Sequence, residues 1–395
     1  MSEVPKNTIE SKLDPELLRP IPPVPSVAGW KEVPFQPSTL DDDLVPMGFA
    51  APEFWSVGTD SIYGGEREAS PYRFGEMGAT TAVFVRRSIA RRLLVAQSLL
   101  PPEYCLVAKD CHRSTEVQAK LSATYIDALR DIHSNMVDGR LVWEPGWNED
   151  RVIAESQNFV SLPSDAPRIR PSPHNTGAVD VVIVRLSDSA AEFRQRVLAE
   201  YAASTAGSEL WNRLQSGGAR ISMPYEQDAT LPDTITRWLA MQHELEADLF
   251  RNPGSQILNF GTPFDYGEPD GKADIDYFEL LGQQRPLEQD ECEARDNRRM
   301  LYNVMRLASL DPLETYADYE ARKLGMQSLR SEWWHFNAPE TQMGAIVAGL
   351  PYATLGAIEL SDENKRFAEA RDNYWLRNNH IVARTHHDRA AVILP

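Results

Sequence analysis

Three short segments of the chain carry side chains that can bind a metal ion and support hydrolysis. The first, SPHNTGAVD, contains His174 and Asp180, and the second, SEWWHFN, contains Glu332 and His335. Two imidazoles and one carboxylate can hold a catalytic zinc ion and leave one coordination position open for water. A second carboxylate can accept a proton from that water. In the third segment, KDCHRS, Arg113 can stabilise negative charge on an attacked carbonyl oxygen.

Each of these residues also has a structural interpretation when it is taken alone. His174 could be a loop histidine that is hydrogen-bonded to the backbone, and Asp180 could form an ion pair with a nearby cation. Glu332 and His335 could be exposed polar residues on either side of a Trp-Trp pair in the core. Two histidines and one carboxylate are also the ligands of non-haem iron oxygenases. Residues three apart on a regular strand face opposite sides, so Glu332 and His335 can reach one metal only at a bulge or a strand end.

The strands that must position these residues follow from the hydrophobic pattern. The segment TAVFVRR, from residue 81, predicts a short strand, and residues 105–111 predict a buried one. Residues 178–187 give the strongest strand signal, because they are dense in β-branched side chains. The SEWWHFN segment, residues 331–337, is also strand-like. We therefore expect Asp180 just inside one strand and His335 on another.

Apolar residues at helical spacing predict the helices of the chain. One helix is expected at SIARRLLVAQSLL, and a long one from Ser114 to about Met136, with Ser114 or Thr115 as its cap. Another covers Asp290 to Leu307. Strands and helices are interleaved without the rhythm of βαβ units, which favours an α+β fold over a parallel doubly wound sheet.

Composition excludes several classes of function. The formal net charge of −18 argues against nucleic-acid and anionic membrane partners, which need clustered Lys and Arg. The three cysteines form no CxxC pair, which argues against a disulfide framework or a sulfur-rich metal site. The chain has no signal-peptide core and no apolar run of about eighteen residues. We expect a soluble cytoplasmic protein, and the sequence leaves open whether it forms a homo-oligomer.

Taken together, the three segments resemble the D-alanyl-D-alanine dipeptidases of the VanX type, zinc enzymes related to zinc D,D-carboxypeptidases and to the Hedgehog signalling fold. The family carries DxxRP, SxHxxGxAxD and ExWH segments in that order. Here they appear as Asp110 to Ser114, Ser172 to Asp180, and Glu332 to His335. The stretches GTPFD, which ends at Asp265, and NRRMLYNVM, which begins at Asn297, also look like the family. The resemblance covers roughly residues 70–187 and 258–340.

The resemblance implies a zinc peptidase fold with an antiparallel central sheet and flanking helices, and hydrolysis of a small dipeptide-like substrate. The zinc ligands that it implies are His174, Asp180 and His335. It also implies that Glu332 is the general base and that Arg113 stabilises the oxyanion. Asp265 matches the family aspartate that receives the amino terminus of the substrate, and Ser172 matches a position that lines the substrate pocket.

The resemblance also sets the expected organisation of the chain. Residues 1–70 are expected to form an extended Pro-rich arm and loops rather than packed elements. Residues 71–350 form the catalytic domain, with a helical insertion at about 188–255. That insertion contains two helical patterns, Ala190 to Leu214 and Asp233 to Phe250. Residues 351–395 form a C-terminal extension that begins with a helical pattern and ends in a basic, His-containing tail.

The chain departs from the family pattern at several points. Five residues separate His174 from Asp180, where the family has six, and Ser114 replaces the family proline. The insertion joins the strand of Asp180 to the loop of Asp265, so we expect it to narrow or extend the pocket and to change specificity. Two alternatives to a zinc dipeptidase remain. One is a repurposed metalloenzyme of a biosynthetic pathway, including one with non-haem iron, and the other is an inactive binding protein.

Overall fold

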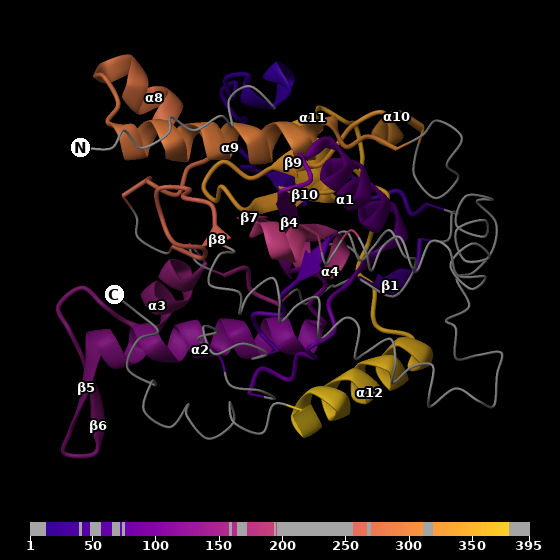
Figure 1. The fold of residues 1–395 in the computed structure, drawn as a ribbon. Helices are drawn as coiled ribbons and strands as arrows, with labels where there is room; N and C mark the ends of the chain where they lie inside the picture. The colour runs from indigo at the N-terminus through magenta and orange to yellow at the C-terminus, as the bar shows by residue number, and fades with distance from the viewer. Residues whose placement is uncertain are drawn as a thin grey trace.

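The fold is α+β, with one central sheet flanked by helices on both sides (Figure 1). The computed structural model describes residues 13–38, 42–47, 57–64, 72, 76–157, 160–163, 172–192, 195, 256–266, 270–310 and 319–378. Both helices expected in the insertion therefore lie almost wholly outside the described residues, as does the basic tail. Within the described residues, no helix is long and apolar enough to cross a membrane.

The strands form three sheets. The central one contains β2 (Gly58–Thr59), β4 (Tyr104–Asp110), β7 (Ala178–Arg185), β8 (Gln256–Ile257), β9 (Gln327–Ser328) and β10 (His335–Asn337). Two smaller sheets pair β1 (Leu44–Pro46) with β3 (Phe84–Arg86), and β5 (Ser134–Val137) with β6 (Arg140–Trp143).

The central sheet has the order β2-β4-β7-β10-β9. Its pairs are antiparallel except β2 and β4, which run parallel, so the expected antiparallel sheet contains one parallel pair. Strand β4 covers one edge of β7 along almost its whole length. Strands β10 and β8 share the other edge of β7, with β10 at its start and β8 at its end.

The helices of the main body are α1 (Arg87–Leu99), α2 (Thr115–His133), α3 (Glu149–Ser156), α4 (Pro173–Thr176), α8 (Tyr277–Gln284) and α9 (Gln289–Leu307). They are followed by α10 (Tyr319–Arg322), α11 (Gln342–Ala348) and α12 (Asp362–Asn378). Helix α1 packs on both β4 and α9, and α2 lies on the opposite side of the sheet in Figure 1.

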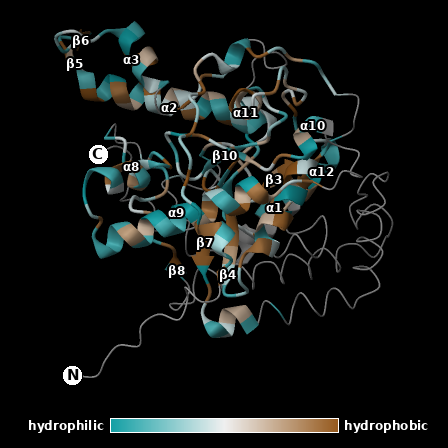
Figure 2. Ribbon diagram, turned by 90° about the horizontal axis from the view of Figure 1, so that it is seen from above, coloured by the Kyte–Doolittle hydropathy of each residue, from teal (hydrophilic) through white to brown (hydrophobic). Residues whose placement is uncertain are grey.

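The core is built around β4 and β7, because side chains on both faces of these two strands are buried along almost their whole length. Leu106, Val107 and Ala108 on β4 have no solvent exposure, and neither do Val181 and Val182 on β7. Figure 2 shows both strands as the most continuous hydrophobic stretch of the ribbon. This double burial explains why their sequences are near-continuous apolar runs rather than alternating patterns.

Residues 13–38 do not form the unpacked arm that their proline content suggested. A 3-10 helix at Pro15–Leu18 packs on α9, and Leu17 is only 2% exposed. Ile21 and Val24 are also buried in the main core. A second 3-10 helix covers Trp30–Glu32. The proline content correctly indicated a largely irregular backbone. The apolar side chains between the prolines nevertheless pack against the core.

The long helix α2 begins where the sequence indicated and ends earlier. The Ser114 hydroxyl accepts a hydrogen bond from Val117 N, so Ser114 is the N-cap. The helix stops at His133 rather than near Met136, because a β-hairpin follows. Its turn is Asp138-Gly139, with φ of 51° and 74°, and two positive φ values are what a two-residue hairpin turn requires.

Both described ends of the insertion lie at the end of β7 that is remote from Asp180, so the insertion does not begin or end at the metal ligands. Arg185, at the end of β7, pairs with Gln256 of β8. Arg185 is five positions after Asp180 on the strand, which corresponds to roughly 16 Å. From β8 the chain then returns toward the site and reaches Asp265.

Candidate metal centre

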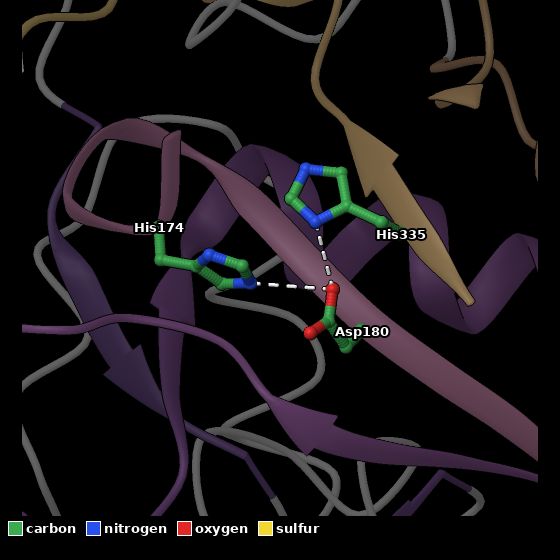
Figure 3. A group of neighbouring side chains, drawn as sticks. All are labelled: His174, Asp180 and His335. Carbon is green, nitrogen blue, oxygen red and sulfur yellow. Dashed lines mark ion pairs between the residues drawn. The ribbon is translucent and has the colours of Figure 1, made fainter. Parts of the chain in front are cut away.

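His174, Asp180 and His335 converge on one point, although they come from three different elements (Figure 3). Asp180 Oδ1 lies 2.9 Å from His335 Nδ1 and 3.2 Å from His174 Nε2. All three residues are buried, and their ligand atoms lie within 4.8 Å of one another. None of these three atoms has a hydrogen-bond partner of acceptable geometry, although all three are shielded from solvent.

Buried polar atoms without partners are rare, because each costs free energy comparable to a lost hydrogen bond. Here they are two imidazole nitrogens and one carboxylate oxygen, the donor set of many zinc and iron sites. A cation at this point would satisfy all three atoms together. The group can therefore bind a metal ion.

Local structure explains how the short spacing between His174 and Asp180 still brings them together. Ser172 is the N-cap of the single helical turn α4, and Pro173 occupies its first position, which suits proline. The turn ends at Gly177, and β7 begins at Ala178. A β-carbon on Gly177 would lie 3.0 Å from side-chain atoms of two neighbouring elements, so the close packing there favours glycine.

Strand register places the other two ligands. Asp180 and His335 are direct partners across β7 and β10. His335 is the first residue of its strand, so the strand is shorter than the SEWWHFN pattern suggested. Glu332 lies in the preceding turn, and its carbonyl oxygen accepts a hydrogen bond from His335 N. The strand end that the Glu332–His335 spacing required is therefore present.

The charges of the three ligands favour a metal-binding state at Asp180. Burial alone would raise the pKa of the Asp180 carboxyl, but His174 and His335 outweigh it and hold that pKa well below its usual range. Burial, together with the positive charge of Arg113, lowers the pKa of His174 and favours its neutral form. Burial also acts to lower the pKa of His335, but Asp180 outweighs it and raises that pKa.

A pocket of about 80 Å³ opens beside the three ligands. A cavity that holds one water has a volume on the order of 10–15 Å³ when volumes are measured in the same way, so this pocket has room for a small molecule of several atoms. Its lining includes His174, Asp180 and His335 together with Glu332, Arg113 and Asp265. Ser172 is buried at the start of α4 and does not belong to that lining.

Glu332 faces both the ligands and the pocket. Its Oε2 lies 3.6 Å from His335 Nδ1, and its side chain remains 31% exposed. Burial raises the pKa of its carboxyl to about 7, and the negative charges of Asp180 and Asp265 act in the same direction. A carboxyl with this pKa can both accept and release a proton near neutral pH.

Arg113 is held by a network of hydrogen bonds. Its Nε and Nη2 both donate to Asp110 Oδ2, its Nη1 donates to Gln118 Oε1 at 3.2 Å, and its Nη2 donates to Tyr63 Oη at 3.2 Å. The guanidinium also lies over the ring of Tyr63. Gln118 is itself fixed, because its Nε2 donates to Ser161 O. Arg113 therefore presents one orientation to the pocket.

Asp265 reaches the pocket from a turn after β8. Its φ is 60°, in the left-handed region, which aspartate tolerates better than most residues other than glycine. Backbone held in this region often marks a site where a side chain must be aimed. The structure therefore brings Asp265 to the same pocket as Glu332 and Arg113.

Sequence reasoning missed the residues that support the site. The sequence identifies Asp110 only as the first residue of the Arg113 segment. In the structure its Oδ2 also lies 3.4 Å from His174 Nε2. Asn337 Oδ1 lies 3.4 Å from His335 Nε2, the ring nitrogen opposite the ligand atom. The sequence signal for Asn337 is its spacing, because residues two apart on a strand share a face.

Comparison with known proteins adds no family assignment. No protein-family model matches this chain, and no curated protein matches it.

Proposed function

We propose that this chain is a zinc-dependent hydrolase that cleaves the amide bond of a small peptide-like substrate, with the fold and chemistry of the VanX-type dipeptidases. The observation that carries the proposal is the convergence of three buried ligand atoms without hydrogen-bond partners. They border a pocket that also contains a carboxylate and an arginine. Zinc-dependent amide hydrolysis combines a polarising ion, a base for water and a donor to the oxyanion.

Each residue has a distinct role in this mechanism. His174, Asp180 and His335 would hold the zinc ion, which would supply Lewis-acid polarisation and lower the pKa of water at the site. Glu332 would accept a proton from the attacking water and return it to the leaving nitrogen. Arg113 donates an N–H to the carbonyl oxygen as it gains negative charge. Asp265 accepts hydrogen bonds from the ammonium group of the substrate.

The same three ligands also suit a non-haem iron site. Two further groups on the pocket favour hydrolysis. Glu332 combines proximity to the ligands with a pKa near neutrality, and Arg113 is locked toward the pocket by Asp110 and Gln118. An oxygenase reaction requires neither a carboxylate base nor an oxyanion donor at these positions, and a binding protein does not require both.

Metal analysis combined with a substrate panel tests the proposal. The purified chain should contain about one zinc per molecule. The panel should contain L,L, D,L, L,D and D,D dipeptides together with their C-terminal carboxamides. At least one class should be hydrolysed, and a chelator should abolish the reaction until zinc is restored. Tight iron binding with oxygen consumption would contradict hydrolysis, as would an inert zinc-loaded protein.

A further inference from the structure

The charges that line the pocket carry information about the substrate, beyond the type of reaction. Asp180, Asp265 and Glu332 are all on the lining, and Asp110 lies directly behind Arg113. When all four carboxylates are ionised they carry four negative charges, whereas a divalent ion and Arg113 together supply three positive charges. The described pocket therefore stays net negative with its metal in place, and it favours a cationic substrate.

Arg113 has little capacity to bind a substrate carboxylate. A guanidinium has five N–H donors, and a carboxylate is held best by two of them in parallel. Four of the five are engaged, two by Asp110 and one each by Gln118 and Tyr63. Among contacts to the described residues, the one N–H without an acceptor is on Nη1. One donor suits a single carbonyl oxygen that gains charge, and it cannot form the paired contact.

No other Lys or Arg belongs to the described lining of this pocket. The nearby Lys109 lines the adjacent cavity instead, and its Nζ lies 2.8 Å from Asp60 Oδ2 and 4.9 Å from the ring centre of Phe264. A substrate carboxylate buried in the described pocket would therefore have a single N–H of Arg113 as its cationic donor from the lining, and such incomplete pairing carries a substantial desolvation cost.

The lining does contain groups that suit a cation. Asp265 and Glu332 provide carboxylates, and Tyr125 provides an aromatic ring. Ammonium groups bind favourably both to carboxylates and to the faces of aromatic rings.

We infer that the substrate carries a free ammonium group and no free carboxylate on its leaving side. Its class is an aminoacyl amide whose leaving group is a neutral amine. Where that leaving group is an amino-acid carboxamide, the substrate is a dipeptide amide rather than a free dipeptide. This inference rests on the proposed hydrolytic function. In the reaction water adds its oxygen to the acyl carbon, the C–N bond breaks, and the leaving nitrogen takes the proton that Glu332 carried.

Matched substrate pairs test the inference. Each pair has the same two residues and stereochemistry, and one member ends in a free carboxylate whereas the other ends in a carboxamide. The zinc-loaded protein should hydrolyse the carboxamide with kcat/KM higher by about tenfold or more, a discrimination typical of one unpaired buried charge. N-acetylation of the carboxamide should remove most of that activity. A preference for the free acid would overturn the inference and leave the hydrolase proposal intact, whereas hydrolysis of neither member would contradict the hydrolase proposal itself.

Tyr63→Phe provides a second test on the same pairs. The substitution keeps the ring over Arg113 and removes the hydroxyl that accepts from Nη2. Arg113 then has a free N–H on each terminal nitrogen, the arrangement that a carboxylate needs. The preference for the carboxamide should fall severalfold, chiefly through a lower KM for the free acid. An unchanged ratio in a folded, zinc-loaded Tyr63→Phe variant would show that the engagement of Arg113 does not set the specificity.

Discussion

Asp180 and His335 lie directly opposite each other on neighbouring antiparallel strands, with Asp180 Oδ1 2.9 Å from His335 Nδ1. The two atoms do not form a hydrogen bond of acceptable geometry, although both are buried. This relationship is what a shared cation explains, because one ion satisfies both atoms and His174 Nε2 as well. The first prediction follows from it.

His335→Ala should reduce the zinc content from about one per chain to near zero, since only two protein ligands would remain. Metal content after dialysis against buffer measures the effect. His133→Ala is the matched control. His133 is the last residue of α2, where its ring stacks on Trp147, and it does not belong to the site. Full zinc occupancy in a His174→Ala, His335→Ala double variant would refute the assignment of the ligands.

Asn337→Leu should lower zinc affinity by roughly 10- to 100-fold, because an acceptor at His335 Nε2 fixes the tautomer that leaves Nδ1 available. The stability of the metal-free protein should change little. Asn337 is fully buried, and its Nδ2 makes no hydrogen bond within the described residues, so the substitution also removes an unsatisfied donor. Competition with a chromophoric chelator measures affinity, and thermal unfolding measures stability. Equal zinc affinity in the variant and the parent would show that Asn337 does not orient His335.

Activity should rise with pH on the acidic side of its profile. Only the ionised form of Glu332 can accept a proton, and burial raises the pKa of this carboxyl to about 7. A bound divalent ion acts in the opposite direction, so kcat/KM should increase up to a limb at or below about pH 7. Glu332→Gln should keep zinc and lose activity, and Glu116→Gln, on the exposed start of α2, is the control. A Glu332→Gln variant with parental kcat would exclude this residue as the base.

Arg113→Ala should lower kcat by roughly 10²–10³ with a smaller change in KM, because the lost hydrogen bond forms mainly in the transition state. Arg113→Lys should rescue only part of the loss. Arg113→Ala also leaves the Asp110 carboxylate buried without its guanidinium partner, which destabilises the fold. The double variant Arg113→Ala, Asp110→Asn removes that charge and separates the two effects. Parental kcat in the folded double variant would reduce Arg113 to a structural residue.

The sequence predicted the residue types of the site better than their surroundings. His174, Asp180 and His335 could be selected because their types and order matched a metal-binding pattern. The β-bulge near the end of β4, which sets Asp110 opposite Asp180, could not be foreseen, because strand register depends on tertiary pairing. The burial of Leu17 likewise depends on α9, which lies far away in the chain. By contrast, the Asp138-Gly139 hairpin had a local signal that the helical pattern of α2 obscured.

The insertion between β7 and β8 gives the last prediction. Arg185 and Gln256 are cross-strand partners, so a short Gly/Ser linker of about six residues in place of residues 190–252 can close the β7–β8 hairpin. The point where the insertion leaves β7 lies roughly 16 Å from Asp180. The shortened protein should therefore fold and bind zinc with parental stoichiometry. The sequence predicts that its ranking of matched carboxamide substrates differs from that of the full chain, and an unchanged ranking would contradict that prediction. Metal content, circular dichroism and kcat/KM on that series measure the outcome. If zinc and fold persist while the ranking changes, the insertion extends to the pocket and contributes to specificity. Loss of zinc would mean that it also supports the ligands themselves.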